Sequence, residues 1–278
     1  MAGSLLEQVN RFAEERKLAL PVVSQVALRL QAIVASDEDY DIAEIEKLIL
    51  SDQALAAEVL RAANSPFFGG LAKATTVRNA VVRLGLKEVT RLLLLASERS
   101  KYGAHDPKIN ELLQTLWRHA GACALAASWL ARRLGYAEFD EQAFIGGLLH
   151  DVGKLWLLRA LDEMKRAKAL EIEPPLSLVK ELIDTAHAAQ GCLLLEKWGL
   201  PEKYVAVARE HHSDAFDRHN SLLLLVRLAN MACRKLGIGL DSDPSIVLMA
   251  AEEAMLLGAG DVLLAELEIE LEDSLARL

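Results

Sequence analysis

The chain has 278 residues, of which 52% are hydrophobic and 5% aromatic, and its formal net charge is −9. This charge argues against general nucleic-acid binding, because contact with phosphates requires a basic surface. No apolar run is long enough to span a membrane, and residues 1–16 are amphipathic and charged, so we expect neither a membrane span nor a secretory signal. The length allows one large domain or two modest ones.

In the first hundred residues, apolar side chains recur every three or four positions, which is the period of an amphipathic helix. The segments with this pattern are Leu5–Phe12, Val26–Val34, Ile42–Leu50, Leu55–Ala63, Val77–Leu84 and Val89–Ala96. Ser51 or Asp52 is a suitable cap for one of these helices, which should end at Asn64. Gly85 should separate the last two helices.

The segment Ser100–Asn110 combines glycine, proline and mixed charges, as linkers do. Beyond it the helical period continues to the C-terminus, and the alternation typical of strands is nearly absent. We therefore expect an all-α protein in which an N-terminal helical part packs on a second helical bundle. The expected parts are residues 1–104, residues 105–240 and an acidic helical extension over residues 241–278.

The three cysteines provide information about the compartment. Cys123, Cys192 and Cys233 lie in apolar helical settings, and none belongs to a CxxC motif. This pattern favours buried thiols over a disulfide or a zinc knuckle. We therefore expect a reducing compartment and a cytoplasmic protein.

Polar side chains interrupt several apolar helices of the second part. Residues 1–100 contain no histidine, whereas six of the seven histidines lie between His119 and His219. The interrupting residues are His119, His150, Asp151, His187, His211, His212 and Asn230. A single one of them could be a core histidine bonded to a carbonyl group, but several indicate that the helices face a common polar centre. His105 and His219 lie in polar segments, where we expect them to be solvated.

A divalent metal ion gives a physical reason for such a centre. Imidazole and carboxylate groups are the usual ligands of transition metals, and a cation makes a buried carboxylate tolerable. His150 and Asp151 would point about 100° apart on a helix, so they could address two sides of one ion or bridge two ions. Lys154, one turn further on, could neutralise the carboxylate or contact a substrate phosphate.

Simpler interpretations remain open at each of these positions. His150 and Asp151 could belong to a hydrogen-bond network at a helix end, and Lys154 could be a capping or surface lysine. The pair His211–His212 could be exposed at the end of an amphipathic helix. His119 and His187 could each bond a backbone carbonyl group without taking part in a shared site.

The order of these motifs resembles that of the HD superfamily of metal-dependent phosphohydrolases, and more closely the HDOD (HD-related output domain) family. In the second half the resemblance is carried by His119, by "GLLHDVGK", by "AHAAQGCLLLEKWGLP" and by His211–His212. In the first half it is carried by "LPVVSQVALRLQ", "LSDQALAAEVLRAANSPFFGG" and "TTVRNAVVRLGLKEVTRLLL". The similarity runs from about Ala19 to Gly237, most of the chain, with the blocks in the family's order.

The resemblance implies which residues bind metal. Carried over position by position, the metal ligands are His119, His150, Asp151, His187, His211 and His212. Asp151 and Lys154 are the catalytic candidates, and Lys154 matches a lysine that lies near the substrate phosphate in catalytic relatives. The resemblance implies one or two divalent ions, with Fe or Mn expected first and Zn, Ni or Mg as alternatives.

Two features depart from the catalytic relatives. Their late aspartate corresponds here to Asn230, whose neutral amide would be a weaker ligand for a divalent cation. The segment after His212 reads "SDAFDRHN" and lacks the Gly-Tyr-Pro sequence that accompanies the hydrolysis of cyclic dinucleotides. The residues therefore favour metal binding more strongly than turnover.

We expect a bacterial signal-transduction module with an HD-type metal site, little or no turnover and a signalling protein as its partner. The alternative is a metal-dependent phosphohydrolase, a phosphodiesterase acting on a nucleotide or cyclic dinucleotide. A third interpretation is a sensor that binds a nucleotide without cleaving it. The sequence does not specify the oligomeric state.

Overall fold

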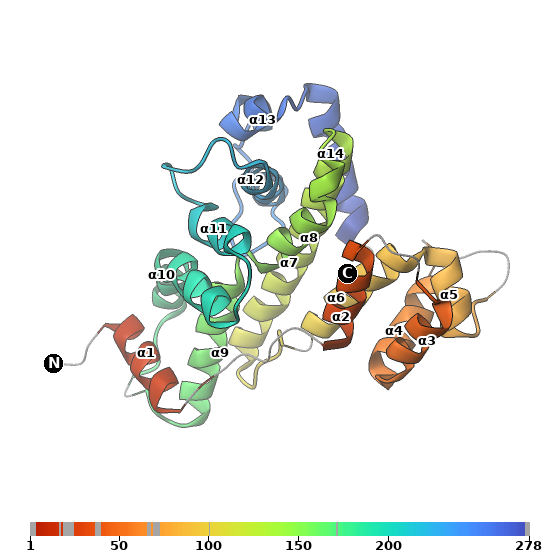
Figure 1. The fold of residues 1–278 in the computed structure, drawn as a ribbon. Coiled ribbons are helices and arrows are strands. Elements are labelled where there is room, and N and C mark those ends of the chain that lie inside the picture. The colour runs from red at the N-terminus through yellow and green to blue at the C-terminus, as the bar shows by residue number, and fades with distance from the viewer. Residues whose placement is uncertain are drawn as a thin grey trace. The chain divides into compact units, whose positions relative to one another are not determined.

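The computed structural model describes residues 4–16, 18, 25–36, 40–65, 68, 73–99, 101–170 and 172–275. These residues form α-helices and short 3-10 helices, with no strand among them, and the predicted all-α class is confirmed (Figure 1). No helix of this described part combines the length and the apolar character that a membrane span requires. The chain divides into two compact units, one formed by Pro21–Lys101 and the other by Met1–Leu20 together with Tyr102–Leu278.

The smaller unit is a helical bundle around an aliphatic core. Its helices are α2 (Gln25–Ser36), α3 (Ile42–Leu50), α4 (Gln53–Ala63), α5 (Val77–Leu84) and α6 (Leu86–Arg99). Both α2 and α4 pack against α6, and the core includes Leu30, Val59 and Leu93. Gly85 separates α5 from α6 with a φ of 81°, a backbone angle that favours glycine, and it thus ends one helix where the sequence predicted.

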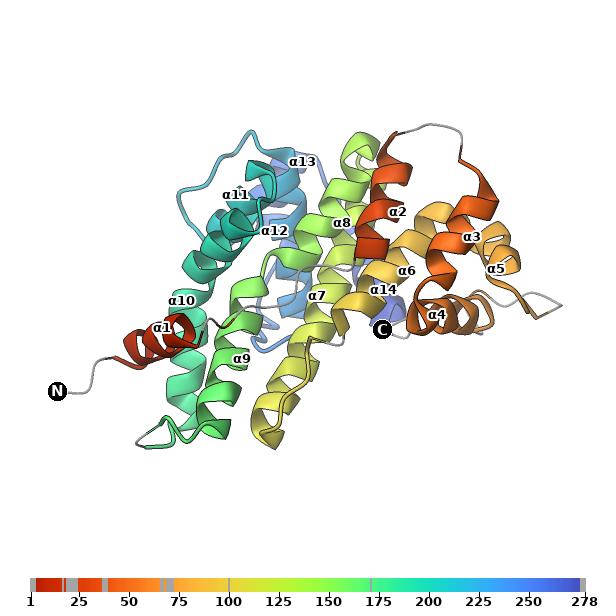
Figure 2. The same ribbon diagram turned by 60° about the horizontal axis from the view of Figure 1, so that its bottom comes forward.

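The larger unit is organised around one long helix, α7 (Pro107–Arg133), which begins at the cap Asp106. The helices α8, α12 and α14 pack against α7, and α9, α10 and α11 follow one another beside it (Figures 1 and 2). The remaining elements of this unit are α1 (Leu5–Glu15), η1 (Ala137–Phe139), α8 (Asp140–Leu149), α9 (Val152–Arg166), α10 (Leu176–Lys197), α11 (Glu202–Glu210), α12 (Ser221–Lys235), η2 (Leu248–Ala250), α13 (Glu252–Leu257) and α14 (Asp261–Leu275).

Both ends of the chain contribute helices to the larger unit. The helix α1 packs against α9 and α10 and buries Val9 and Ala13. The acidic C-terminal segment contributes α14, which packs on α7 through buried leucines that include Leu267 and Leu271. The periodicity predicts these helices, but it does not predict which apolar surface each one covers.

Two glycines allow the helices that carry polar residues to approach each other closely. A Cβ atom on Gly147 of α8 would lie 2.7 Å from the Cα of Ala124 in α7. A Cβ atom on Gly153 of α9 would lie 1.9 Å from the backbone oxygen of His187 in α10. Backbone atoms cannot rotate out of such a contact, so glycine is required at both positions.

We expect Gly147→Ala to destabilise the protein, because the added methyl group would force α8 away from α7. Overpacking of this kind costs about 1–3 kcal/mol and more where backbone must move. Thermal unfolding followed by circular dichroism measures the effect. Gly103→Ala is the matched control, because a Cβ atom there meets nothing within 4 Å. Equal melting temperatures for the two variants would contradict the close packing of α7 and α8.

Candidate metal centre

Four histidines and one aspartate from five helices of the larger unit meet in its interior. His119 lies within α7, and His187 lies within α10. His150 is the residue after α8, Asp151 is the residue before α9, and His211 is the residue after α11. All five side chains are buried, with 1–3% of their surface exposed. We call these five residues the metal centre.

One ring nitrogen of each histidine is fixed by the backbone. The Nδ1 atom of His119 lies 2.8 Å from the carbonyl oxygen of Ile238, and that of His150 lies 2.8 Å from the oxygen of Gly147. The Nδ1 atoms of His187 and His211 lie 2.8 Å and 3.0 Å from the carbonyl oxygens of residues 183 and 208. A carbonyl oxygen only accepts hydrogen bonds, so Nδ1 carries the hydrogen in every ring. The Nε2 atoms are therefore available as ligands.

The four Nε2 atoms divide equally between the two oxygens of Asp151. The Nε2 atoms of His119 and His150 both lie 3.4 Å from Oδ2. Those of His187 and His211 lie 3.5 Å and 3.3 Å from Oδ1. The carboxylate thus faces two separate pairs of imidazoles, one pair on each oxygen.

The distances within each pair fit coordination of a cation. The two Nε2 atoms of His119 and His150 are 3.2 Å apart, and so are those of His187 and His211. Two nitrogens that each lie about 2.1 Å from one metal ion are roughly 3.0–3.4 Å apart at tetrahedral or octahedral angles. The residues therefore form two candidate sites, His119–His150–Asp151 and His187–His211–Asp151, with His212 in reach of the second.

The lack of hydrogen bonds from the described chain to the carboxylate of Asp151 also fits a cation. Among the described residues, neither oxygen of this buried carboxylate accepts a hydrogen bond of ordinary geometry, although Lys154 Nζ lies 3.0 Å from Oδ2. Burial alone would raise the pKa of Asp151, but Lys154 and the imidazoles outweigh it and hold the pKa well below its usual range. An ionised buried carboxylate with so few partners is costly unless positive charge compensates it.

The imidazoles differ in their affinity for protons. Burial lowers the pKa of His187 to about 4, so this ring is neutral near pH 7 and can offer its lone pair to a metal. Burial also disfavours a charge on His119, but the nearby carboxylate of Asp151 and the thiol of Cys233 outweigh it and raise the pKa of His119 to about 10. Without metal, the ring of His119 therefore carries a second proton and a positive charge, which offsets part of the negative charge of Asp151. The ring of His187 stays neutral.

A narrow opening leads to the metal centre from the segment that follows α12. Its cavity volume is about 10 Å³, which is the space of roughly one water molecule. Lys154, His212, Asn230 and Arg234 line it, together with Asp241. The buried Lys154 lies between Asp151 and Asp241, whose Oδ2 is 3.6 Å away, and these carboxylates raise the pKa of Lys154 despite its burial, so its ammonium group is charged.

The structure brings His119, His150, His187 and His211 together with Asp151 and Lys154. His212 is exposed, with its ring centre 4.2 Å from that of His211, and Asn230 is buried at the wall of the opening. His105 and His219 lie outside the centre and are exposed.

Sequence reasoning missed three residues of the opening. Arg234 lies one helical turn after Asn230, and its buried Nε atom has no hydrogen-bond partner in the described part of the chain. Asp241 faces Lys154, and Gly239 lies directly against His119 with a φ of 141°, a backbone angle that favours glycine. The helical spacing from Asn230 could have indicated Arg234. No sequence pattern shows that the segment after α12 folds back over the centre.

Comparison with known proteins identifies related sequences. The family model of the HDOD domain matches residues 20–214. An uncharacterized protein of Treponema pallidum (strain Nichols) is 29% identical over 222 residues, which make up 77% of this chain and 42% of that protein. The chain therefore spans less than half the length of this curated relative.

Solved structures share the fold. An HDOD domain protein with unknown function from Geobacter sulfurreducens has a TM-score of 0.73 and 22% identity, over 98% of this chain and 97% of that chain. A protein of Shewanella amazonensis SB2B, provisionally named a metal-dependent phosphohydrolase, has a TM-score of 0.66 and 18% identity over 98% of both chains. A provisionally named signal transduction protein from Marinobacter aquaeolei VT8 has a TM-score of 0.67 and 23% identity, over 98% of this chain and 63% of that chain.

The two candidate sites generate a prediction about metal content. We expect the purified protein to bind roughly two divalent ions per chain, because each oxygen of Asp151 faces its own pair of imidazoles. His119→Ala should lose one ion, His187→Ala should lose the other, and Asp151→Ala should lose both. Elemental analysis after gel filtration measures the content, and His219→Ala is the control. A His119→Ala variant that retains both ions would contradict the two-site arrangement.

Metal binding should release a proton. In the metal-free protein His119, with a pKa of about 10, is protonated at pH 7.5, whereas a metal ligand must be neutral. The apparent affinity should therefore rise as pH rises toward 10, by up to about tenfold per pH unit. Isothermal titration calorimetry in two buffers of different ionisation enthalpy counts the protons. Buffer-independent heats for the unmodified protein, equal to those of His119→Ala, would contradict this prediction.

Proposed function

The chain belongs to the HDOD family, and on this basis we propose that it is a regulatory signal-transduction module whose HD-type centre binds divalent metal with little or no turnover. The arrangement of Asp151 between two pairs of imidazoles carries this proposal. It supports metal binding directly, since it offers imidazole nitrogens and an ionised carboxylate in a buried site.

The same centre is poorly equipped for turnover. An opening of about 10 Å³ admits a water molecule, whereas sites for small organic ligands usually measure about 300–1,000 Å³. Asn230 lies at this opening in the place of the late aspartate of catalytic relatives, and an amide neutralises less of the charge of a metal ion. Both features favour a metal ion that holds the helices together over one that processes a substrate.

In this proposal the metal ligands join separate helices of the larger unit. His119 and Asp151 would connect α7 with the start of α9, and His187 and His211 would connect α10 with the end of α11. A bound cation would supply the missing positive charge and, in an enzyme, would polarise a phosphoryl oxygen and activate water. The module would then present its helical surface to a signalling protein in a form that depends on metal.

A second candidate function is a metal-dependent phosphohydrolase acting on a nucleotide or cyclic dinucleotide. The observation that favours it is the pair of cationic side chains at the opening. Lys154 is buried and charged beside Asp151, and Arg234 lines the same opening with its Nε atom without a partner in the described residues. Two such cations could bind phosphate oxygens if the segment after α12 moved away.

The two functions differ in one measurable property. We expect the metal-loaded protein to hydrolyse neither bis(p-nitrophenyl) phosphate nor a panel of nucleotides and cyclic dinucleotides, because substrate cannot reach the centre. Turnover that is abolished in Asp151→Asn would contradict the regulatory proposal and support the phosphohydrolase.

Asn230→Asp should bind metal roughly tenfold more tightly than the unmodified protein, because a carboxylate replaces a neutral amide.

The chain offers a matched control for the Asn230 variant. Asn220→Asp makes the same chemical change on the same helix, but Asn220 caps the N-terminus of α12, where aspartate is equally suitable. Its metal affinity should be unchanged. If Asn230→Asp and Asn220→Asp bound metal with equal affinity, Asn230 would not be in reach of the ions.

A further inference from the structure

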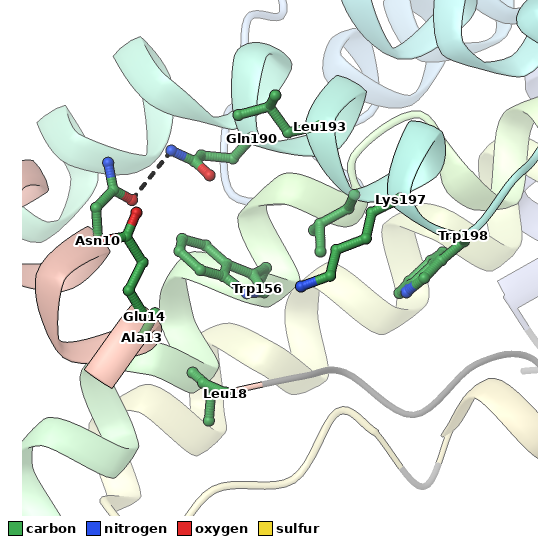
Figure 3. A pocket seen from close by; sticks show the side chains of 10 residues that line it. Asn10, Ala13, Glu14, Leu18, Trp156, Gln190, Leu193, Lys197 and Trp198 are labelled. Carbon is green, nitrogen blue, oxygen red and sulfur yellow. Dashed lines mark hydrogen bonds between the residues drawn. The ribbon is translucent and has the colours of Figure 1, made fainter. Parts of the chain in front are cut away.

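A second, larger pocket lies outside the metal centre, between α1, α9 and α10. Its volume is about 590 Å³, within the range of sites that bind small organic molecules. Figure 3 shows its walls: Trp156 stands in the middle, Asn10 and Glu14 of α1 lie on one side, and Lys197 and Trp198 lie on the other. We call it the tryptophan pocket.

The aromatic wall suits a flat ligand. Trp156 is buried, with 7% of its surface exposed, and its indole ring borders the pocket near Leu193 of α10. A planar heteroaromatic ring fits between aromatic and aliphatic walls of this kind, and contact with an indole ring contributes to its affinity. Aliphatic side chains alone would not distinguish a flat ring from any other apolar group.

The polar groups of the pocket are arranged by charge. On the α1 side, Asn10 Oδ1 accepts a hydrogen bond of 3.2 Å from Gln190 Nε2, and the carboxylate of Glu14 lies beside it. This pair leaves an amide donor on Asn10 and an amide acceptor on Gln190, which together with Glu14 can bind the edge of a base that carries an amino group. On the other side Lys197 extends its ammonium group toward Trp156 and can bind an anion.

We propose that the tryptophan pocket binds a mononucleotide whose base carries an exocyclic amino group. The base packs against the exposed part of Trp156, its amino edge faces Glu14 and Asn10, and its phosphate faces Lys197. This separation of charges selects the direction of binding, because a phosphate beside Glu14 would be repelled. The net charge of −9 disfavours a long nucleic acid.

The pocket is separate from the metal centre but is built on two of the same helices. Trp156 lies on α9, which begins directly after Asp151, and Gln190 lies on α10 one turn after His187. Gly153 of α9 and Gly191 of α10 are in contact between the two sites. A nucleotide in the pocket would therefore act on the two helices that carry metal ligands, which gives the regulatory module an input site.

Titration of the intrinsic tryptophan fluorescence with AMP tests the proposal, with IMP and adenosine as comparison ligands. We expect saturable binding of AMP. IMP, which lacks the amino group, and adenosine, which lacks the phosphate, should each bind about tenfold more weakly, since each loses one hydrogen-bonded contact. GMP and CMP carry amino groups and should bind, whereas UMP should not. If none of these nucleotides binds, or if AMP and UMP bind equally, the proposal is wrong.

Two variants place the ligand in this pocket. Lys197→Met should reduce AMP affinity to that of adenosine, because the phosphate loses its cationic partner. Adenosine binding should be unchanged, because adenosine has no phosphate and this exposed lysine is not needed for folding. The control is Lys203→Met, another exposed lysine, which lies over the ring of Tyr204 outside the pocket. Asp151→Asn should retain AMP binding. Loss of AMP binding in Asp151→Asn but not in Lys197→Met would show that the nucleotide binds at the metal centre, and would overturn the proposal without affecting the proposed metal-dependent module.

Discussion

The structure of the larger unit depends on one electrostatic constraint, the ionised carboxylate of Asp151 in a dry interior. Burial of a charge is costly, and the polar groups around it are arranged in ways that reduce this cost. Lys154 supplies one positive charge at 3.0 Å, and four imidazoles turn their Nε2 atoms toward the two oxygens. Every Nδ1 atom is occupied by a backbone carbonyl group, so the rings cannot all turn away. A cation is the simplest group that satisfies all of these atoms together.

The packing of the helices follows from this constraint. Ligands on different helices can meet around one carboxylate only if the helix axes are close, and side chains at the crossing points would hold them apart. Gly147 and Gly153 remove those side chains at the contacts of α8 with α7 and of α9 with α10. The sequence "GLLHDVGK" thus combines the ligands with the glycines that let them converge.

The sequence predicted the fold class and the histidine set because both leave local signals. Apolar residues recur every three to four positions in each helix, and a polar residue among them is easily recognised, as at His119 and His187. The positions of Asp241 and Gly239 left no such signal, because they depend on the path of a segment after α12. The packing of α1 against α9 and α10 could not be predicted from the sequence either, since any apolar stripe can cover any apolar surface of matching size. Because α1 forms one wall of the tryptophan pocket, that pocket could not be predicted either.

In the larger unit, the buried charged groups of the metal centre and the cavity large enough for an organic ligand, the tryptophan pocket, therefore lie at different places. The metal centre has ligands but an opening of about 10 Å³, whereas the tryptophan pocket has about 590 Å³ and no set of metal ligands among its described lining residues. In a hydrolase the two properties would have to coincide, because the substrate must touch the metal. In a regulatory module they can be separate, provided that rigid elements connect them. Here α9 and α10 run from one site to the other, in contact at Gly153 and Gly191, so a ligand that changed their spacing at the pocket would also act on the elements that carry Asp151 and His187.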